Sequence, residues 1–280
     1  MNSENLEPVK PISIKGMFLE KNPRLATKIP GFVYQYINRI LHIDEINELL
    51  ANHGTEKGTE FAQSMVTHFN VTETIKGAGN IPSSGRFIFA SNHPLGGFDA
   101  LLILCNIQRF LGQPITLVND VLMHIPQLRP IFIPLNKYGG HNKEVIRQLH
   151  EAYSSDKQIL IFPCGFASRR KKGIIQDPEW KKHFIAKSIE YQRDIIPVHV
   201  SGRNSNFFYN LANFRTFFRI PWNLETFYLA DETFRHKNQK FTITFGKPIS
   251  HKHFDKSKTL ERWAAEVKDL VYSLPNETLT

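Results

Sequence analysis

The sequence is poor in cysteine and has no long hydrophobic run. Its 280 residues include 2 cysteines, Cys105 and Cys164, both in apolar surroundings. Two such cysteines do not make a disulfide framework, and their setting suits a reducing compartment. No uncharged apolar stretch reaches the roughly 18–20 residues that cross a bilayer, and residues 1–15 lack the apolar core of a signal peptide. We therefore expect any membrane contact to be peripheral.

Nucleic-acid motifs are also missing, although the chain is basic. It has neither the spacing of a zinc finger nor the aromatic signature of an RNA-recognition motif. The formal net charge of +9 favours anionic partners such as acidic lipid headgroups or an acidic protein. His251 and His253 stand close together but without further ligands nearby, so no metal site is predicted. We expect no nucleic-acid partner.

Length and pattern predict an α/β domain with an N-terminal addition. Residues 1–23 contain several prolines and are expected to form a loose tail, and residues 24–70 an N-terminal helical extension. In residues 71–280, short apolar runs alternate with helical segments. This alternation predicts an α/β fold with a mostly parallel central sheet flanked by helices. In such folds, ligands bind beyond the carboxyl ends of the strands.

Hydrophobic periodicity predicts the individual elements. Apolar runs typical of strands occur at 87–90, 114–118, 131–134, 159–162, 195–200, 226–229 and 241–245, and apolar and polar residues alternate at 71–76, as in a half-buried or edge strand. Helical spacing occurs at 31–43, 45–52, 61–69, 99–111, 143–153 and 260–272, with a short helix or turn at 121–126. Asp44 is expected to cap the helix 45–52. Asp177 followed by Pro178 is a typical helix start, so another helix is predicted to begin there.

The stretch 87–99 places a histidine and a carboxylate around a flexible turn. A buried strand is expected to end just before His93, and Gly96 and Gly97 allow backbone angles that other residues avoid. A chain that curls there brings Asp99 toward the imidazole. A carboxylate bonded to one ring nitrogen leaves the other nitrogen as a base. The simpler alternative is that Asp99 only caps the following helix and that His93 has no chemistry.

This stretch, Asn-His-Pro-Leu-Gly-Gly-Phe-Asp, resembles the first motif of the glycerolipid (lysophospholipid) acyltransferase superfamily. Members of that superfamily carry a His and an Asp at the end of a strand. One more residue than usual separates His93 from Asp99, which is similar to the variant in the branch that acylates amino-acid lipids such as ornithine and glycine lipids. The resemblance runs from about Asn70 to Ile249. It implies an acyltransferase α/β domain over 71–280.

The segment Ile161–Arg169 resembles the third block of the same family, Phe-Pro-Glu-Gly-Thr-Arg-Ser. Cys164 replaces the Glu, and the nearest arginine is displaced to Arg169. The resemblance implies acceptor contacts from Ser168, Arg169 and Arg170. Because the residues that usually hold a phosphate-bearing acceptor are changed, an amino-acid lipid fits better than lysophosphatidic acid.

Three further positions follow from the resemblance. Gly165 is expected to offer a backbone N–H to the oxyanion. Pro197 lies in a strand that resembles the fourth block, whose members line the acyl site. Lys137 stands near the place of the headgroup-binding arginine of the second block, and a plain surface lysine is the alternative.

Two features leave alternatives open. Cys164 near a histidine is a candidate nucleophile, but it stands at the end of an apolar strand, where cysteine is commonly a small hydrophobic residue, and we favour that interpretation. The segment 203–219 interleaves phenylalanines with arginines, which suits either a helix in a membrane interface or a helix packed in a core. The basic run 168–172 is either a headgroup and lipid contact or a solvated surface.

The expected activity is transfer of a fatty acyl group from an acyl carrier protein or coenzyme A thioester to the hydroxyl of a lyso-lipid acceptor. His93 would be the general base and Asp99 its orienting partner. No tightly bound cofactor and no metal are expected, because the thioester is already activated. The expected location is peripheral, on the cytoplasmic face of the inner membrane. The alternatives are a non-catalytic lipid-binding protein that uses the same cleft and a hydrolase that passes the acyl group to water.

Overall fold

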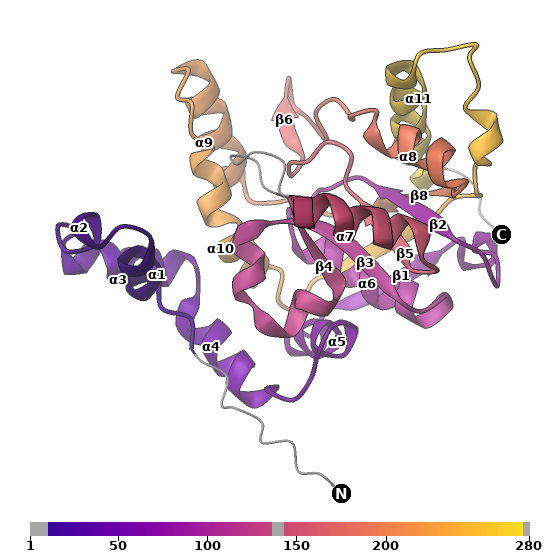
Figure 1. The fold of residues 1–280 in the computed structure, drawn as a ribbon. Helices are drawn as coiled ribbons and strands as arrows, with labels where there is room; N and C mark the ends of the chain where they lie inside the picture. The colour runs from indigo at the N-terminus through magenta and orange to yellow at the C-terminus, as the bar shows by residue number, and fades with distance from the viewer. Residues whose placement is uncertain (1–10, 136–142, 277–280) are drawn as a thin grey trace, which may run out of the picture.

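A seven-stranded sheet forms the centre of the molecule (Figure 1). The structure, a computed structural model, describes residues 11–135 and 143–276. The strand order is β1-β9-β8-β2-β5-β3-β4, and every neighbouring pair is parallel except β8 with β9. The predicted mostly parallel α/β sheet is therefore confirmed. The strands are β1 (Thr72–Lys76), β2 (Phe87–Ser91), β3 (Pro114–Asn119), β4 (Phe132–Leu135), β5 (Gln158–Ile161), β8 (Asp194–Val200) and β9 (Lys240–Phe245).

Helices cover both faces of the sheet and bury its apolar side chains. α5 (Thr59–His68) and α6 (Phe98–Phe110) pack on one face, where their side chains form one core with Phe89, Leu160 and Ile196. α7 (Lys143–Ser154), α8 (His183–Tyr191) and α11 (Leu260–Ser273) cover the other face (Figure 1). Because both faces are covered, the central strands are apolar throughout, as β2 is.

The N-terminal helices stand beside the sheet (Figure 1). They are α1 (Ile14–Lys21), α2 (Pro23–Ala26), α3 (Gly31–Ile40) and α4 (Ile43–Asn52), and Ile14, Tyr34 and Ile43 form their own small core. The prediction of a loose tail is therefore wrong for residues 14–21. Asp44 lies in the first turn of α4 and is not its cap. No helix in the described part of the chain is long and apolar enough to cross a bilayer.

Two further predictions of secondary structure are wrong. The apolar run at 226–229 is no strand: it belongs to the short 3-10 helix η4 (Leu224–Tyr228) and to α10 (Leu229–Arg235). Short apolar runs do not distinguish strand from buried helix. The helix expected at Asp177 begins only at His183, because the Asp177 carboxylate binds groups distant in sequence.

The basic run after β5 has a structure that periodicity did not indicate. Residues Arg169–Lys171 (β6) and Ile174–Gln176 (β7) form a small antiparallel hairpin whose turn is Lys172-Gly173. Both turn residues have positive φ, 51° and 81°, which glycine adopts without strain. The hairpin leads on from the carboxyl end of β5. Because β2, β5 and β8 are parallel, the loops after them lie at one edge of the sheet.

Candidate active site

His93 and Asp99 meet at the carboxyl end of β2. His93 Nδ1 lies 3.0 Å from Asp99 Oδ2. The same carboxylate accepts backbone N–H groups of Leu95 at 3.0 Å, Gly97 at 3.1 Å and Ala100 at 3.0 Å. Asp99 is fully buried, whereas the His93 side chain is 14% exposed. The predicted contact between the two side chains is therefore present, with the second ring nitrogen of His93 not used by it.

The turn between them requires glycine at one position in particular. Gly96 has a φ of +76°, and a Cβ there would come within 2.5 Å of Leu229. Gly97 occupies the N-cap position of α6, and Asp99 lies in the first turn of that helix. The alternative that Asp99 only caps this helix is therefore wrong, because the N-cap residue is Gly97. The Asp99 side chain binds the preceding loop and the imidazole, while its negative charge lies at the positive end of the helix dipole.

The environment keeps Asp99 ionised. Burial alone would raise the pKa of this carboxyl group, but the charge and hydrogen bond of His93 and the N–H groups of Leu95 and Gly97 outweigh burial and lower the pKa below its ordinary value. An ionised Asp99 accepts a proton-bearing Nδ1. It thereby fixes the tautomer in which Nε2 of His93 has a free lone pair.

Contacts on three further sides hold His93. Its ring stacks on Phe162, with 3.9 Å between the centroids. Its backbone N–H donates to Asp177 Oδ1 at 3.1 Å, and its carbonyl accepts the backbone N–H of Ser168 at 2.8 Å. The Ser168 hydroxyl also donates to Asp177 Oδ1, at 2.6 Å. Asp177 and Ser168 together hold the loop on which His93 lies.

Asp177 is the site residue that the sequence did not reveal. It is 3% exposed, and Trp180 Nε1 donates to its second oxygen at 2.9 Å. Its own N–H donates to the Tyr272 hydroxyl at 2.7 Å, which connects the site to α11. In the sequence, Asp177 before Pro178 is typical of a helix start. Only the tertiary contacts distinguish a buried bridging carboxylate from a cap.

A pocket of about 220 Å³ opens in front of the His93 ring. Its lining is mainly apolar and comes from β3, β4, β5, the loops after β2 and β5 and the start of α6, so the predicted cleft between the loops after β2 and β5 is confirmed. The lining residues include His93, Gly96, Gly97, Val118, Leu122, Phe132, Phe162 and Gly165. Such a pocket suits an apolar chain with its reactive end at His93.

Gly165 lies in this pocket, but its backbone N–H is already engaged. It donates to the Phe162 carbonyl at 2.9 Å within a turn where Gly165 has a φ of +68°. The expected oxyanion contact from this N–H is therefore not formed by the structure as it stands. Cys164 is 3% exposed, its thiol donates to the Phe166 carbonyl at 2.8 Å, and burial raises its pKa. A protonated, buried thiol is no nucleophile.

Three of the four residues expected to hold the acceptor, Ser168, Arg169 and Arg170, do not line the pocket. Arg169 is paired with the fully buried Glu225 at 2.9 Å and lies over the Phe208 ring. Arg170 donates to the side chains of Asn206 and Asn210. Ser168 is 1% exposed and bound to Asp177, so it supports the loop and is not accessible to a ligand.

The remaining predicted positions are also away from the His93 pocket or not described. Pro197 is buried in β8, where its carbonyl accepts the N–H of Gly246 at 2.8 Å, and it does not line the pocket. Lys137 lies outside the described residues. In the described part of the chain, no group of three or more His, Cys, Asp or Glu side chains is arranged to hold a metal ion.

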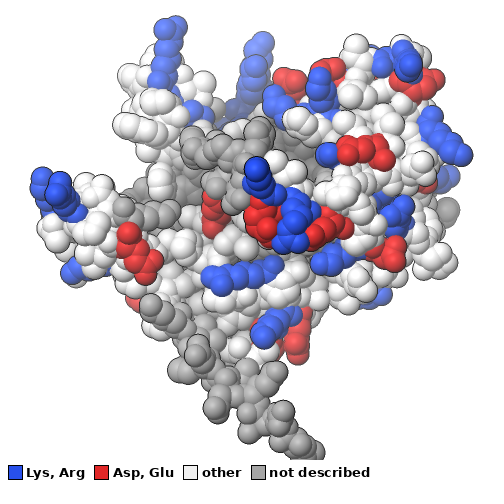
Figure 2. Space-filling model, in the orientation of Figure 1, with Lys and Arg blue, Asp and Glu red and all other residues white. Residues whose placement is uncertain are grey.

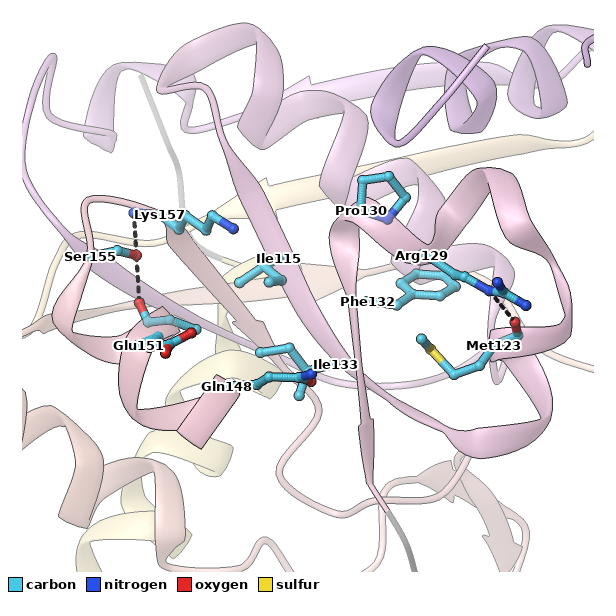
Figure 3. Close-up of a pocket in the computed structure, with 11 residues that line it drawn as sticks. Ile115, Met123, Arg129, Pro130, Phe132, Ile133, Gln148, Glu151, Ser155 and Lys157 are labelled. Atoms are coloured by element: carbon cyan, nitrogen blue, oxygen red, sulfur yellow. Dashed lines mark hydrogen bonds between the residues drawn. The ribbon is translucent and has the colours of Figure 1, made fainter. Parts of the chain in front are cut away.

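A second pocket, of about 370 Å³ (Figure 3), shares the lining residue Phe132 with the His93 pocket. Phe132 and Ile133 of β4 and Ile115 of β3 form its apolar floor. Arg129, whose Nε donates to the Met123 carbonyl at 2.8 Å, and Lys157 lie at its rim. It contains no histidine and no cysteine. Although it is the larger of the two, the smaller pocket has the base and its carboxylate, and we take the smaller one as the candidate active site.

The chain is similar to known acyltransferases over most of its length. The family model described as acyltransferase matches residues 16–279. The lyso-glycine lipid O-acyltransferase of Bacteroides thetaiotaomicron is 43% identical over 264 residues, which cover 94% of this chain and 97% of that protein. The lyso-glycine lipid O-acyltransferase of Phocaeicola vulgatus is 41% identical, over 94% of this chain and 95% of its own.

Among solved structures, the 1-acyl-sn-glycerophosphate (LPA) acyltransferase of Thermotoga maritima is similar to this chain. Its sequence identity is 20%, and the match covers 79% of this chain and 80% of that one with a TM-score of 0.48.

Proposed function

This chain belongs to the acyltransferase family, and on that premise we propose that it transfers a fatty acyl group from a thioester to the hydroxyl of a lyso-glycine lipid. The family membership makes it an O-acyltransferase and decides against the non-catalytic lipid-binding protein. The acceptor follows from the names of relatives that share more than two fifths of its residues. The observation that carries the mechanism is the His93–Asp99 pair at the mouth of an apolar pocket.

In the proposed reaction, His93 is the general base. Its Nε2 takes the proton of the acceptor hydroxyl while the hydroxyl oxygen attacks the thioester carbonyl. The tetrahedral intermediate collapses, the C–S bond breaks, and the thiolate leaves with the proton that His93 held. Asp99 keeps the imidazole in the required tautomer and stabilises its charged form. Because Asp99 is ionised and buried, it performs this role without exchanging the proton itself.

The N-terminus of α6 is the source of positive potential that the structure offers to the oxyanion. Gly96, Gly97 and Ala100 line the pocket at that end of the helix. Helix N-termini stabilise negative charge through the helix dipole, whereas the N–H groups of Gly97 and Ala100 themselves donate to Asp99 Oδ1. We therefore propose the helix dipole in place of the Gly165 N–H, which donates to the Phe162 carbonyl.

The acyl chain and the acceptor have different requirements. Val118, Leu122, Phe132 and Phe162 offer apolar surface to the fatty chain. Arg169, expected to hold the acceptor headgroup, is neutralised by Glu225 instead. An acceptor with a strongly anionic phosphate therefore finds no unpaired arginine at this position, which supports an amino-acid lipid over lysophosphatidic acid.

The donor and the location complete the proposal. The donor is an acyl thioester of acyl carrier protein or coenzyme A, and the chain's positive charge suits both the acidic protein and the coenzyme phosphates. We propose a peripheral enzyme on the cytoplasmic face of the inner membrane, where a lyso-lipid acceptor is available. No tightly bound cofactor or metal is part of the proposed mechanism.

A purified-enzyme assay tests the proposal. The protein is incubated with an acyl thioester and lyso-glycine lipid, and both free thiol and diacyl product are measured. We expect thiol release that depends on acceptor and equals product formation. Thiol release at the same rate without acceptor would instead identify a hydrolase, and preference for lysophosphatidic acid would contradict the assigned acceptor.

A further inference from the structure

Six large aromatic side chains stand exposed on α9 (Asn206–Phe217) and the segment that follows it to η4. We call this surface the aromatic ridge. Phe217 is 80% exposed and Trp222 is 71% exposed, and the others are between 48% and 58%. Its members are Phe207, Phe214, Phe217, Phe218, Trp222 and Phe227. Soluble monomers rarely expose so much contiguous apolar surface without a partner.

The ridge is rigid at its base. Phe208 and Tyr209, on the inner side of α9, are fully buried and pack with Ala167 of the loop after β5. Ser205 caps the helix by accepting the N–H of Phe208 at 3.2 Å. The ridge side chains also contact one another, with 4.5 Å between the ring centroids of Phe214 and Phe218. The aromatic side chains are therefore presented on an ordered element.

The exposed charge of the ridge is of one sign. Between residues 201 and 230, the sequence has a single acidic residue, Glu225, and it is fully buried. Arg169 at 2.9 Å and Arg215 at 3.0 Å neutralise it. Arg203 and Arg219 of the same segment are exposed. Over α9 and over the neighbouring β6 hairpin, Figure 2 shows white and blue atoms and no red ones.

Two neighbouring elements extend this surface. Lys171 and Lys172 are exposed in the β6–β7 hairpin, which Arg170 joins to α9 through Asn206 and Asn210. On the other side, the Tyr36 hydroxyl of α3 lies 2.5 Å from that of Tyr228, whose ring contacts Phe207. Phe32 of α3 is 70% exposed. Apolar side chains flanked by cations thus cover one end of the molecule.

We propose that the aromatic ridge, with the cations that flank it, binds the surface of an anionic lipid bilayer. Exposed phenylalanines and a tryptophan enter the boundary between headgroups and acyl chains, and arginine and lysine side chains bind anionic headgroups. An acidic protein would find the same cations, but six exposed aromatic side chains exceed what an electrostatic partner requires. A bilayer offers acyl chains to the exposed aromatic side chains and anionic headgroups to the cations that flank them.

The position of the ridge gives this surface a role in the reaction, and this step rests on the proposed function. Leu229, which packs with the base of α9, borders Gly96 in the wall of the His93 pocket. β2, β5 and β8 end at the same edge of the sheet, and α9 follows β8. Docking through the ridge would bring this edge to the membrane, so that a lyso-lipid reaches His93 without crossing water.

Tryptophan fluorescence tests the contact directly. The chain has three tryptophans; Trp180 and Trp263 are 2% and 5% exposed, and only Trp222 is accessible. We expect vesicles of phosphatidylcholine with phosphatidylglycerol to shift the emission to shorter wavelength, and pure phosphatidylcholine to do so less. Trp222→Phe should abolish the shift while the protein still sediments with vesicles. An unshifted wild-type emission in the presence of anionic vesicles would overturn the proposal.

Vesicle co-sedimentation of variants separates the two parts of the surface. Phe217→Ser with Phe218→Ser should weaken binding at least about tenfold, because two exposed aromatic groups are lost. Lys171→Gln, Lys172→Gln and Arg219→Gln should each weaken it about fivefold, as expected for a basic residue near an anionic surface. The controls are Ile146→Ser, an exposed apolar residue on α7, and Lys252→Gln, an exposed cation near the C-terminus. Equal binding by ridge and control variants would overturn the proposal.

Other occupants of the ridge give distinct results. A Trp222 shift with acyl carrier protein and none with vesicles would identify an acidic protein, and a ridge variant that only changes the oligomeric state would identify a second copy; either result would overturn the bilayer assignment. The ridge variants should keep activity on water-soluble short-chain substrates, and His93→Ala should keep vesicle binding. If the protein binds vesicles but fails the transferase assay, the proposed function is contradicted and the bilayer assignment is not.

Discussion

The His93 loop and the aromatic ridge lie at the same edge of the sheet, but their contacts are opposite in kind. His93 has its ring stacked on Phe162, its Nδ1 on Asp99 and its backbone bound by Asp177 and Ser168. The outer face of the ridge has large exposed apolar side chains, whose ring contacts join Phe214, Phe217 and Phe218 to one another and Phe207 to Tyr228. The contacts of the His93 loop are all made within the chain, whereas most of the ridge surface faces solvent.

This difference separates two physical tasks. A general base needs one orientation and one tautomer, and several independent contacts give that precision. A surface that enters a lipid layer needs apolar area and positive charge, and it needs no fixed partner. Substitutions in the loop should therefore change the chemical step, and substitutions on the ridge should change where the enzyme binds.

The largest effect is expected from removal of the base. His93→Ala should lower acyl transfer about 10³-fold, because none of the other described residues that line the pocket has a basic side chain to accept the acceptor proton. Thiol release from an acyl thioester measures it. The matched control is His251→Ala, since His251 also pairs with an aspartate, Asp194, at 2.8 Å but lies away from the pocket. Equal losses in the two variants would contradict the assignment of His93.

Removal of the charge that orients His93 should have the next effect. Asp99→Asn keeps the shape of the side chain but places an amide against Nδ1, and we expect a loss of about 10²-fold in kcat. Asp194→Asn, in the other His–Asp pair, is the control and should leave kcat unchanged. Vesicle binding of Asp99→Asn should equal that of wild type. If both variants keep full activity, the dyad has no catalytic role.

Loss of the buried charge beneath the ridge should change stability. Glu225→Gln leaves Arg169 and Arg215 without their shared carboxylate, which should lower the free energy of unfolding by about 2 kcal/mol. Urea unfolding measures this change. Glu266→Gln removes a similarly shared carboxylate that is 31% exposed, and it should lower the free energy of unfolding far less, because exposed ion pairs contribute little. A Glu225 effect no larger than the Glu266 effect would show that the ridge does not depend on this ion pair.

The support of the His93 backbone predicts a smaller kinetic effect. Asp177→Asn weakens the hydrogen bonds from the Ser168 hydroxyl and the His93 N–H, and it should lower kcat about tenfold with little change in KM. Asp156→Asn, at an exposed carboxylate, is the control. A change confined to KM, or to thermal stability, would assign Asp177 to substrate binding or to folding instead.

The smallest effect concerns acid stability. The pKa of Asp99 in the folded protein lies below its ordinary value of 3.8. Asp99 therefore adds stability at neutral pH, and this contribution is lost as the pH falls below that value toward the folded-state pKa. The difference in unfolding free energy between wild type and Asp99→Asn should narrow below about pH 4. The corresponding difference in unfolding free energy between wild type and Phe217→Ser should not change with pH. If the difference for Asp99→Asn is also constant with pH, the lowered pKa of Asp99 is contradicted.

Much of the fold was predictable from short-range pattern. The strands of the sheet follow apolar runs, and the main helices follow helical spacing, because burial of one face imposes that periodicity. The failures have local causes. The run at 226–229 is too short to distinguish strand from helix, and the cationic run 169–176 becomes a hairpin through its Lys172-Gly173 turn.

The candidate site was predictable only in its centre. His93 and Asp99 are six positions apart across two glycines, so local chain geometry brings them together and local sequence indicates it. Ser168, Arg169 and Pro197 were assigned to ligand contacts, but the structure gives them internal partners. The sequence pattern at Asp177 predicts a helix cap, whereas the partners that make it a bridging residue, His93, Ser168 and Tyr272, come from other segments.

The sequence by itself determined the layered α/β architecture, the apolar strands and the His–Asp pair, since all of these depend on residues that are near one another along the chain. The tertiary structure alone decided which arginines are already neutralised, which carboxylate supports His93 and which phenylalanines remain exposed. Each of those outcomes depends on segments separated by tens of residues, so burial and charge pairing at these positions exist only after the chain has folded.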